Sequence, residues 1–278
     1  MKWLSAKFHL LNILNLDVAA GAVGMALLVN YVFGLQIHPA NYYLLFSSVW
    51  AIYLVDHLYD SRKPEAVSER RKFFKNYHRS FLWVLILNII FTFGIFIWQF
   101  NVMMVIYASP ALGITFVYIL ANWLFQENHQ RFYLKEIFIS IGYSLGIMVI
   151  PLSIRRVVDA QAAVLTLIII LMALWNLLLI ARFERTIDEK EGQTSMSQWM
   201  SASSIKRINA ILFALFAGTA LFYGYNFEVS LKLLLVFIAF CIYMAVPLFF
   251  PRMFRKKERY HRYVDMVFLI SFLCLVPF

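Results

Sequence analysis

Two pairs of acidic residues are the strongest chemical signal in this 278-residue sequence. Asp56 and Asp60 form the first pair, Glu184 and Asp188 form the second, and within each pair the acids are four positions apart. This spacing places both carboxylates of a pair on one helical face, with Cβ atoms about 5–6 Å apart. Two like charges at that distance repel unless a cation lies between them, and Mg²⁺ binds one or two protein carboxylates together with substrate phosphate and water.

Basic residues accompany both acidic pairs. Arg62 and Lys63 follow the first pair, and Lys190 follows the second. Two carboxylate pairs beside Lys and Arg suit a two-metal clamp on a diphosphate, because metal ions bridge phosphate oxygens and cations neutralise the leaving charge. The alternative is that the acids are solvated and face Arg62 and Lys63, since short loops between membrane spans are where charged residues gather.

The composition indicates which kind of scaffold must position these acids. Hydrophobic residues make up 62% of the chain and charged residues 14%, with a mean hydropathy of +0.73. A soluble domain has about 45–50% apolar and about 25% charged residues. The composition therefore excludes a soluble globular enzyme, a disordered chain and a nucleic-acid-binding module. We expect no nucleic-acid partner, and we assign most of the net charge of +10 to contacts with anionic membrane lipids.

Nine apolar runs come close to or exceed the length of a membrane-spanning helix, which needs about 20 apolar residues. They cover residues 10–35, 41–58, 81–100, 102–124, 136–154, 161–182, 207–224, 230–250 and 263–278. We therefore expect an all-α, polytopic membrane bundle of nine transmembrane helices around a central cavity. Residues 1–278 are predicted to form a single transmembrane domain.

The polar breaks between these runs alternate in charge. Of the 25 Lys and Arg residues, only Arg155, Arg156 and Lys232 fall in odd-numbered breaks; the others lie at the N-terminal end or in even-numbered breaks. Because basic residues concentrate on the cytoplasmic side of a membrane, the N-terminus is predicted to be cytoplasmic. Segments 56–80 and 183–206, which carry the acidic pairs, are expected on the same side. We expect an integral, multi-pass protein, with a bacterial inner membrane as its location.

Two polar residues within predicted spans are candidates for the wall of a cavity. Asp17 lies in the first run, and an ionisable group in a span usually faces the bundle interior or a wet cavity. Asn176 lies two turns before Glu184, so that it is expected on the same helical face.

These features together resemble the UbiA superfamily of intramembrane prenyltransferases. That family combines nine helices with two Asp-rich motifs, NxxxDxxxD after helix 2 and DxxxD followed by GxxT-like residues after helix 6. Asp56 and Asp60 match the acids of the first motif. Glu184 and Asp188 resemble those of the second, and positions 192 and 194 carry a Gly and a Thr close to the following pattern.

The sequence departs from the family pattern at three places. Ile52 stands at the position of the Asn in the first motif, and Glu184 replaces the usual Asp in the second. A basic residue often found near the start of the first helix is absent from residues 15–18. The first Asp-rich motif is therefore divergent.

The resemblance implies Mg²⁺-dependent transfer of an isoprenyl group from isoprenyl diphosphate to an aromatic or lipidic acceptor, such as a quinone precursor, within the membrane. It implies that the catalytic residues and metal ligands are Asp56, Asp60, Glu184 and Asp188. The candidate substrate-binding residues are Tyr133, Lys135, Arg62, Lys63, Arg70, Arg71, Lys190 and Asn176. Lys135 equally fits an interfacial lysine that extends toward water. A terpene cyclase of the same fold and a non-catalytic membrane subunit remain as alternatives.

Overall fold

The computed structural model describes residues 10–62, 68–127, 134–191, 196–227, 229–254 and 259–276. Two predicted site residues, Lys63 and Tyr133, lie outside these ranges, and so does the side chain of Asp188. All regular secondary structure in the described part of the chain is helical. The prediction of an all-α protein is therefore confirmed.

Seven described helices are long and apolar enough to cross a membrane. Because such a helix satisfies its own backbone hydrogen bonds, it is the form in which an apolar run is stable in lipid. The chain thus has the architecture of an integral, multi-pass membrane protein. The seven helices are α2 (Leu16–Phe33), α5 (His78–Trp98), α6 (Val102–Glu127), α7 (Lys135–Arg155), α8 (Ala160–Glu191), α10 (Ala202–Asn226) and α11 (Leu231–Phe249).

The two other predicted spans correspond to helical segments that do not reach this standard. The first is α3 (Pro39–Asp60), which has 22 residues, including polar ones along its length. The second is the apolar part of the C-terminal segment, residues 263–275, which comprises the end of α12 (Arg259–Asp265) and the 3₁₀ helix η3 (Met266–Leu275). The nine-helix count therefore stays a prediction.

The first predicted span is confirmed as α2, but it begins later than predicted, because a break separates α2 from the short helical stretch at residues 10–13. Asn15 lies at this break with φ 52° and ψ 27°. Asn tolerates this left-handed conformation better than other residues with a side chain, apart from Asp. The indole Nε1 of Trp50 donates a hydrogen bond of 3.1 Å to the carbonyl of Leu14, so that this turn has a partner in α3.

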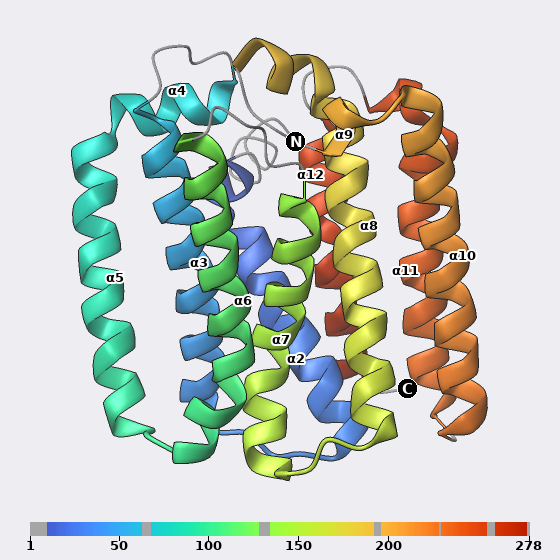
Figure 1. Cartoon of the computed structure of the whole chain (residues 1–278). Helices are drawn as coiled ribbons and strands as arrows, with labels where there is room; N and C mark the ends of the chain where they lie inside the picture. The colour runs from blue at the N-terminus through green and yellow to red at the C-terminus, as the bar shows by residue number, and fades with distance from the viewer. Residues whose placement is uncertain are drawn as a thin grey trace.

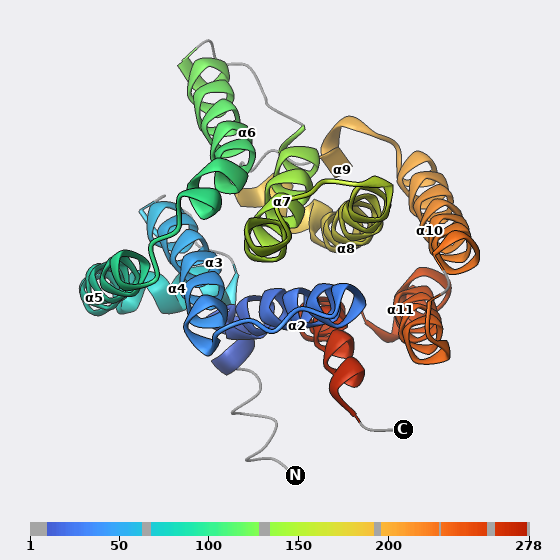
Figure 2. The same ribbon diagram turned by 90° about the horizontal axis from the view of Figure 1, so that it is seen from below.

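The helices lie side by side in Figure 1, and the segments between them alternate between the two ends of the bundle. The upper end carries the short helices α4 (Glu69–Asn76) and α9 (Met196–Trp199), and it is called the motif end below because α3 and α8 finish there. Seen from below, α2 and α7 face each other, with α8 beside α7 (Figure 2). The main hydrophobic core joins α2, α7, α8, α10, α11 and η3.

Close contact between α2 and η3 depends on two glycines. A methyl group at Gly21 would overlap the side chain of Phe268, and one at Gly24 would overlap Ser271. The two positions are three residues apart and therefore share a helical face. Small residues at such an interface allow two helix backbones to approach closely within a membrane.

Candidate functional site

A cavity of about 1350 Å³ lies within the bundle, bordered by residues of α2, α3, α4, α5, α6, α7, α8, α12 and η3. Its wall is mostly apolar, and its described charged residues come from α3, α4, α7, α8 and α12. Cavities that hold small molecules typically measure about 300–1,000 Å³, so this one can hold a ligand with a long apolar chain.

Both acids of the first pair line the cavity from the last two turns of α3. Oδ2 of Asp60 is 3.5 Å from Nη2 of Arg71 on α4, and Arg71 is buried. The ring of His57, which lies between the two acids in the sequence, packs against Phe74 with centroids 4.8 Å apart. These contacts fix α4 against the end of α3, so that Arg71 faces the same cavity as the acids.

The second acidic pair lies on helix α8, which continues to Glu191 and so extends beyond the predicted apolar run. Glu184 lines the cavity together with Ile187, one turn further along α8. Asp188 belongs to the same helix, and its side chain is outside the described part. The structure thus brings Asp56, Asp60 and Glu184, from both motifs, to one cavity.

The predicted substrate-binding residues divide into two groups. Lys135, Arg70, Arg71 and Asn176 line the cavity. Arg62 and Lys190 are exposed and are not among the residues of its wall. Asn176 is buried and donates a hydrogen bond of 2.8 Å from Nδ2 to the carbonyl of Val264.

Two buried acids of the cavity wall were not predicted. Glu136 is 2% exposed and accepts a hydrogen bond of 3.0 Å at Oε1 from the backbone N–H of Met196, while its Oε2 has no partner among the described residues. Asp265 is 6% exposed, and its Oδ2 accepts from Nδ2 of Asn12 at 3.3 Å. The available signals were an acid beside Lys135 and a lone acid within the last apolar run.

Two tyrosines of the cavity wall show how these charges are grouped. The phenol of Tyr118 interacts electrostatically with Asp56, Asp60, Lys135 and Glu136. The phenol of Tyr53 interacts with Asp17, Asp56, Arg70 and Asp265. Asp56 belongs to both groups.

The donor set fits magnesium, a hard cation that binds carboxylate oxygens. Among the described residues, no three His, Cys, Asp or Glu side chains form a group that could hold a metal ion. Mg²⁺ does not require such a group, because it keeps several waters and takes further ligands from a substrate phosphate. Asp56, Asp60 and Glu184 can therefore each supply a carboxylate to a magnesium ion whose other ligands are waters and phosphate oxygens.

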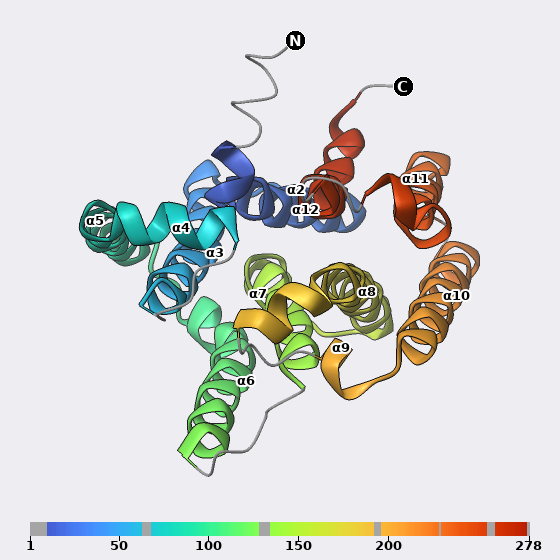
Figure 3. The same ribbon diagram turned by 90° about the horizontal axis from the view of Figure 1, so that it is seen from above.

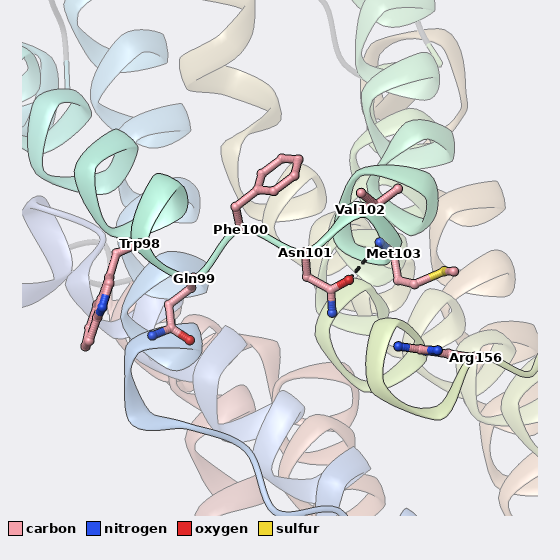
Figure 4. A pocket seen from close by; sticks show the side chains of 7 residues that line it. All are labelled: Trp98, Gln99, Phe100, Asn101, Val102, Met103 and Arg156. Carbon is pink, nitrogen blue, oxygen red and sulfur yellow. Dashed lines mark hydrogen bonds between the residues drawn. The ribbon is translucent and has the colours of Figure 1, made fainter.

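A second pocket, of about 610 Å³, is drawn in Figure 4 and lies where α5 joins α6, at the end of the bundle opposite the motif end (Figure 1). It is formed by residues 98–103 and by Arg156. Oδ1 of Asn101 accepts a hydrogen bond of 2.9 Å from the backbone N–H of Met103 and so caps the start of α6. This pocket contains no acid and none of the predicted site residues, so the central cavity is the candidate site.

No family model matches the chain, and no curated protein or solved structure matches it either.

Proposed function

We propose that the chain is a UbiA-like intramembrane prenyltransferase. It transfers an isoprenyl group, with Mg²⁺, from isoprenyl diphosphate to an aromatic or lipidic acceptor. The observation that carries this proposal is the meeting of acids from both motifs, Asp56, Asp60 and Glu184, at one large apolar cavity in a membrane-type bundle. Such a cavity suits a substrate with a charged head and a hydrocarbon tail.

The charge of the cavity wall explains why a metal ion is needed. Its described residues include three cations against six carboxylates, the latter being Asp56, Asp60, Glu69, Glu136, Glu184 and Asp265. A diphosphate alone would be repelled by this excess of negative charge. The carboxylates would hold divalent cations, whose charge would offset this excess and favour binding of the diphosphate.

The residues of the chain have separate tasks in the proposed reaction. Mg²⁺, when bound, neutralises the charge on the departing diphosphate. Lys135, Arg70 and Arg71 provide fixed positive charge at the same end of the cavity, which stabilises the leaving group without reorganisation. The apolar wall, which includes Phe93 and Leu112, excludes water, so that the electron-poor allylic carbon meets the acceptor instead.

The proposal includes the full membrane topology. In this topology α3 and the C-terminal segment also cross the membrane, which brings the seven apolar helices to a total of nine spans. We place the motif end, with α4 and α9, in the cytoplasm, because the segments between spans that are rich in Lys and Arg lie at this end. Figure 3 shows the motif end from above. The membrane proposed is a bacterial inner membrane. Cysteine labelling of Arg62→Cys from either side of the membrane tests this orientation.

The decisive experiment is binding and turnover with purified protein. Isoprenyl diphosphate should raise the unfolding temperature only with Mg²⁺, and it should be consumed only when an acceptor is also present. Glu184→Gln should weaken the Mg²⁺-dependent shift at least tenfold in apparent affinity. The matched control is Glu189→Gln on the same helix, because Glu189 pairs with Arg185 and does not line the cavity. Equal effects of the two substitutions would contradict the proposal.

A terpene cyclase and a non-catalytic subunit are second candidates because of Ile52. It lines the cavity where the first motif has Asn, and an isoleucine cannot bind a metal. Consumption of the diphosphate without an acceptor, with release of a cyclic hydrocarbon, would favour the cyclase. Absence of any response to Mg²⁺ and diphosphate would favour the non-catalytic subunit.

A further inference from the structure

A second polar region lies deeper in the cavity than the motif acids. Along α7, Tyr143 follows Lys135 by eight residues, and along α8, Asn176 precedes Glu184 by eight residues. At 1.5 Å per residue, both lie about 12 Å further into the bundle. Asn176 contacts Val264, the neighbour of Asp265, and the ring of Tyr143 lies 5.2 Å from that of Phe268. These contacts bring α7, α8 and the C-terminal segment together at this depth.

The region has the features of a built site. Four polar side chains of this region line the cavity and are more than nine-tenths buried: Asn12 at 5%, Asn15 at 1%, Asn176 at 3% and Asp265 at 6% exposure. Nδ2 of Asn12 donates to Oδ2 of Asp17 at 2.7 Å and to Oδ2 of Asp265 at 3.3 Å. The backbone carbonyl of Asn12 accepts from Nη2 of Arg70 at 3.0 Å, so α4 holds this network in place.

Some polar atoms of this region have no partner among the described residues. They are Oδ1 of Asn15 and the hydroxyl of Tyr143, and both residues line the cavity. A buried polar atom without a partner costs about 1–3 kcal/mol, so each of these atoms calls for a partner, which a bound ligand can supply. The amide oxygen can only accept a hydrogen bond, and Asp265, when ionised, would repel a bound anion. The region therefore favours a ligand that donates hydrogen bonds and has no negative charge.

We propose that Asn12, Asn15, Tyr143 and Asp265 form the subsite for the acceptor, and that this subsite selects an uncharged, hydroxyl-bearing head group over a carboxylate. The inference rests on the proposed function, since it names the acceptor class for the same cavity. Tyr53 connects the two regions, because its phenol interacts with Asp56 of the motif and with Asp265 of the subsite. A head group bound at the subsite thus lies in the same cavity as the diphosphate.

The test compares probes that differ in one group, bound to the full chain in nanodiscs and measured by saturation-transfer NMR and thermal shift. The first pair is 4-(hydroxymethyl)phenol and 4-hydroxybenzoate, which share a ring and differ in charge. We expect the uncharged compound to bind at least tenfold more tightly. A third probe, 4-methoxybenzyl methyl ether, lacks hydroxyl donors and should bind as poorly as the carboxylate. A glycerol ether, 1-O-octylglycerol, distinguishes a lipid source from an aromatic source of the hydroxyl groups, and binding of either neutral donor supports the proposal.

Two variants locate the binding. Asp265→Asn keeps an oxygen that can accept from Asn12 and removes the ionisable group. The ratio of the affinity for the uncharged probe to the affinity for the carboxylate should therefore fall at least tenfold. Asn15→Gly is compatible with the left-handed backbone at this position and should weaken binding of the uncharged probe about two- to tenfold. Asp159→Asn, which changes an acid outside the cavity, is the control and should leave all four affinities unchanged.

Three results would overturn the proposal: equal binding of the carboxylate, no binding of either neutral donor, or binding unaffected by both cavity variants. Binding of diphosphate with Mg²⁺ is measured separately on the same samples. If only that measurement fails, the prenyltransferase function is wrong, and the proposal of an acceptor subsite fails with it. If only the probe measurements fail, the function stands and the acceptor class is wrong.

Discussion

The ion pair between Asp60 and Arg71 connects the first motif to α4, and its contribution can be measured. The closest atoms are 3.5 Å apart, and the side chains are 21% and 4% exposed. Coulomb's law with an effective dielectric constant of about 20 gives about 5 kcal/mol at that distance. This is a ceiling, because desolvation of the buried guanidinium and the partial exposure of Asp60 both reduce the net value. We expect a coupling of about 1–3 kcal/mol.

The experiment is a double-mutant cycle with Arg71→Met and Asp60→Asn. Arg71→Met should lower the free energy of unfolding by about 2–4 kcal/mol, because it leaves a partly buried carboxylate beside the acidic cavity. The double variant should be more stable than the sum of the single changes by the coupling energy. Unfolding is followed by tryptophan fluorescence in mixed micelles with increasing SDS.

An exposed pair provides the control for this cycle. Nε of Arg185 and Oε1 of Glu189 are 3.3 Å apart on α8, with side chains 34% and 54% exposed. Surface pairs of this kind typically contribute about 0.3–0.5 kcal/mol. If the Asp60–Arg71 coupling is no larger than that of the control pair, burial does not strengthen the contact, and the account of α4 as a fixed part of the site is wrong.

Three further predictions concern the scaffold. Gly24→Ala should lower the free energy of unfolding by about 1–3 kcal/mol, because the added methyl group would overlap Ser271. Gly94→Ala should not lower it, because Gly94 has open space around it. Thermal melts in detergent compare the two variants. Asp159→Ala should cost about 1 kcal/mol, because Oδ1 of Asp159 accepts from the N–H of Ala162 at 2.9 Å and caps α8. That hydrogen bond, together with Arg155, lowers the pKa of Asp159 from its ordinary value of 3.8. The ionised carboxylate therefore stabilises the protein at neutral pH, and this stabilisation is lost as the pH falls through the lowered pKa. A series of thermal melts from pH 7 to acid should show this loss in the native protein and not in Asp159→Asn.

Hydropathy predicted the seven described helices that are long and apolar enough to cross a membrane, and it did not predict where each helix ends. The apolar run of α8 stops near residue 182, but the helix continues to Glu191. Its last turns contain Arg, Glu and Lys, which have high helix propensity, and the Arg185–Glu189 pair adds a favourable contact four residues apart. As a result the second acidic pair is presented from a helix rather than from a loop.

The first run shows the opposite error. Residues 10–35 are apolar enough to read as one span, yet the chain breaks at Asn15. At the break, the carbonyl of Leu14 accepts a hydrogen bond from Trp50, which lies far along the sequence on α3. No local pattern contains that partner, so the break could not be predicted from composition or periodicity.

The same distinction explains which site residues were predicted. Asp56, Asp60 and Glu184 carry their signal in local spacing, because two acids four residues apart share a helical face in any helical fold. Glu136 and Asp265 have no such local partner, and each is held by a distant segment, at Met196 and at Asn12. Desolvation makes an unpaired buried carboxylate costly, and the residues that satisfy these two acids are known only from the fold. Asn176 is the one residue of the deeper half of the cavity that spacing predicted, and the other residues proposed there to decide acceptor specificity depend on contacts between distant segments.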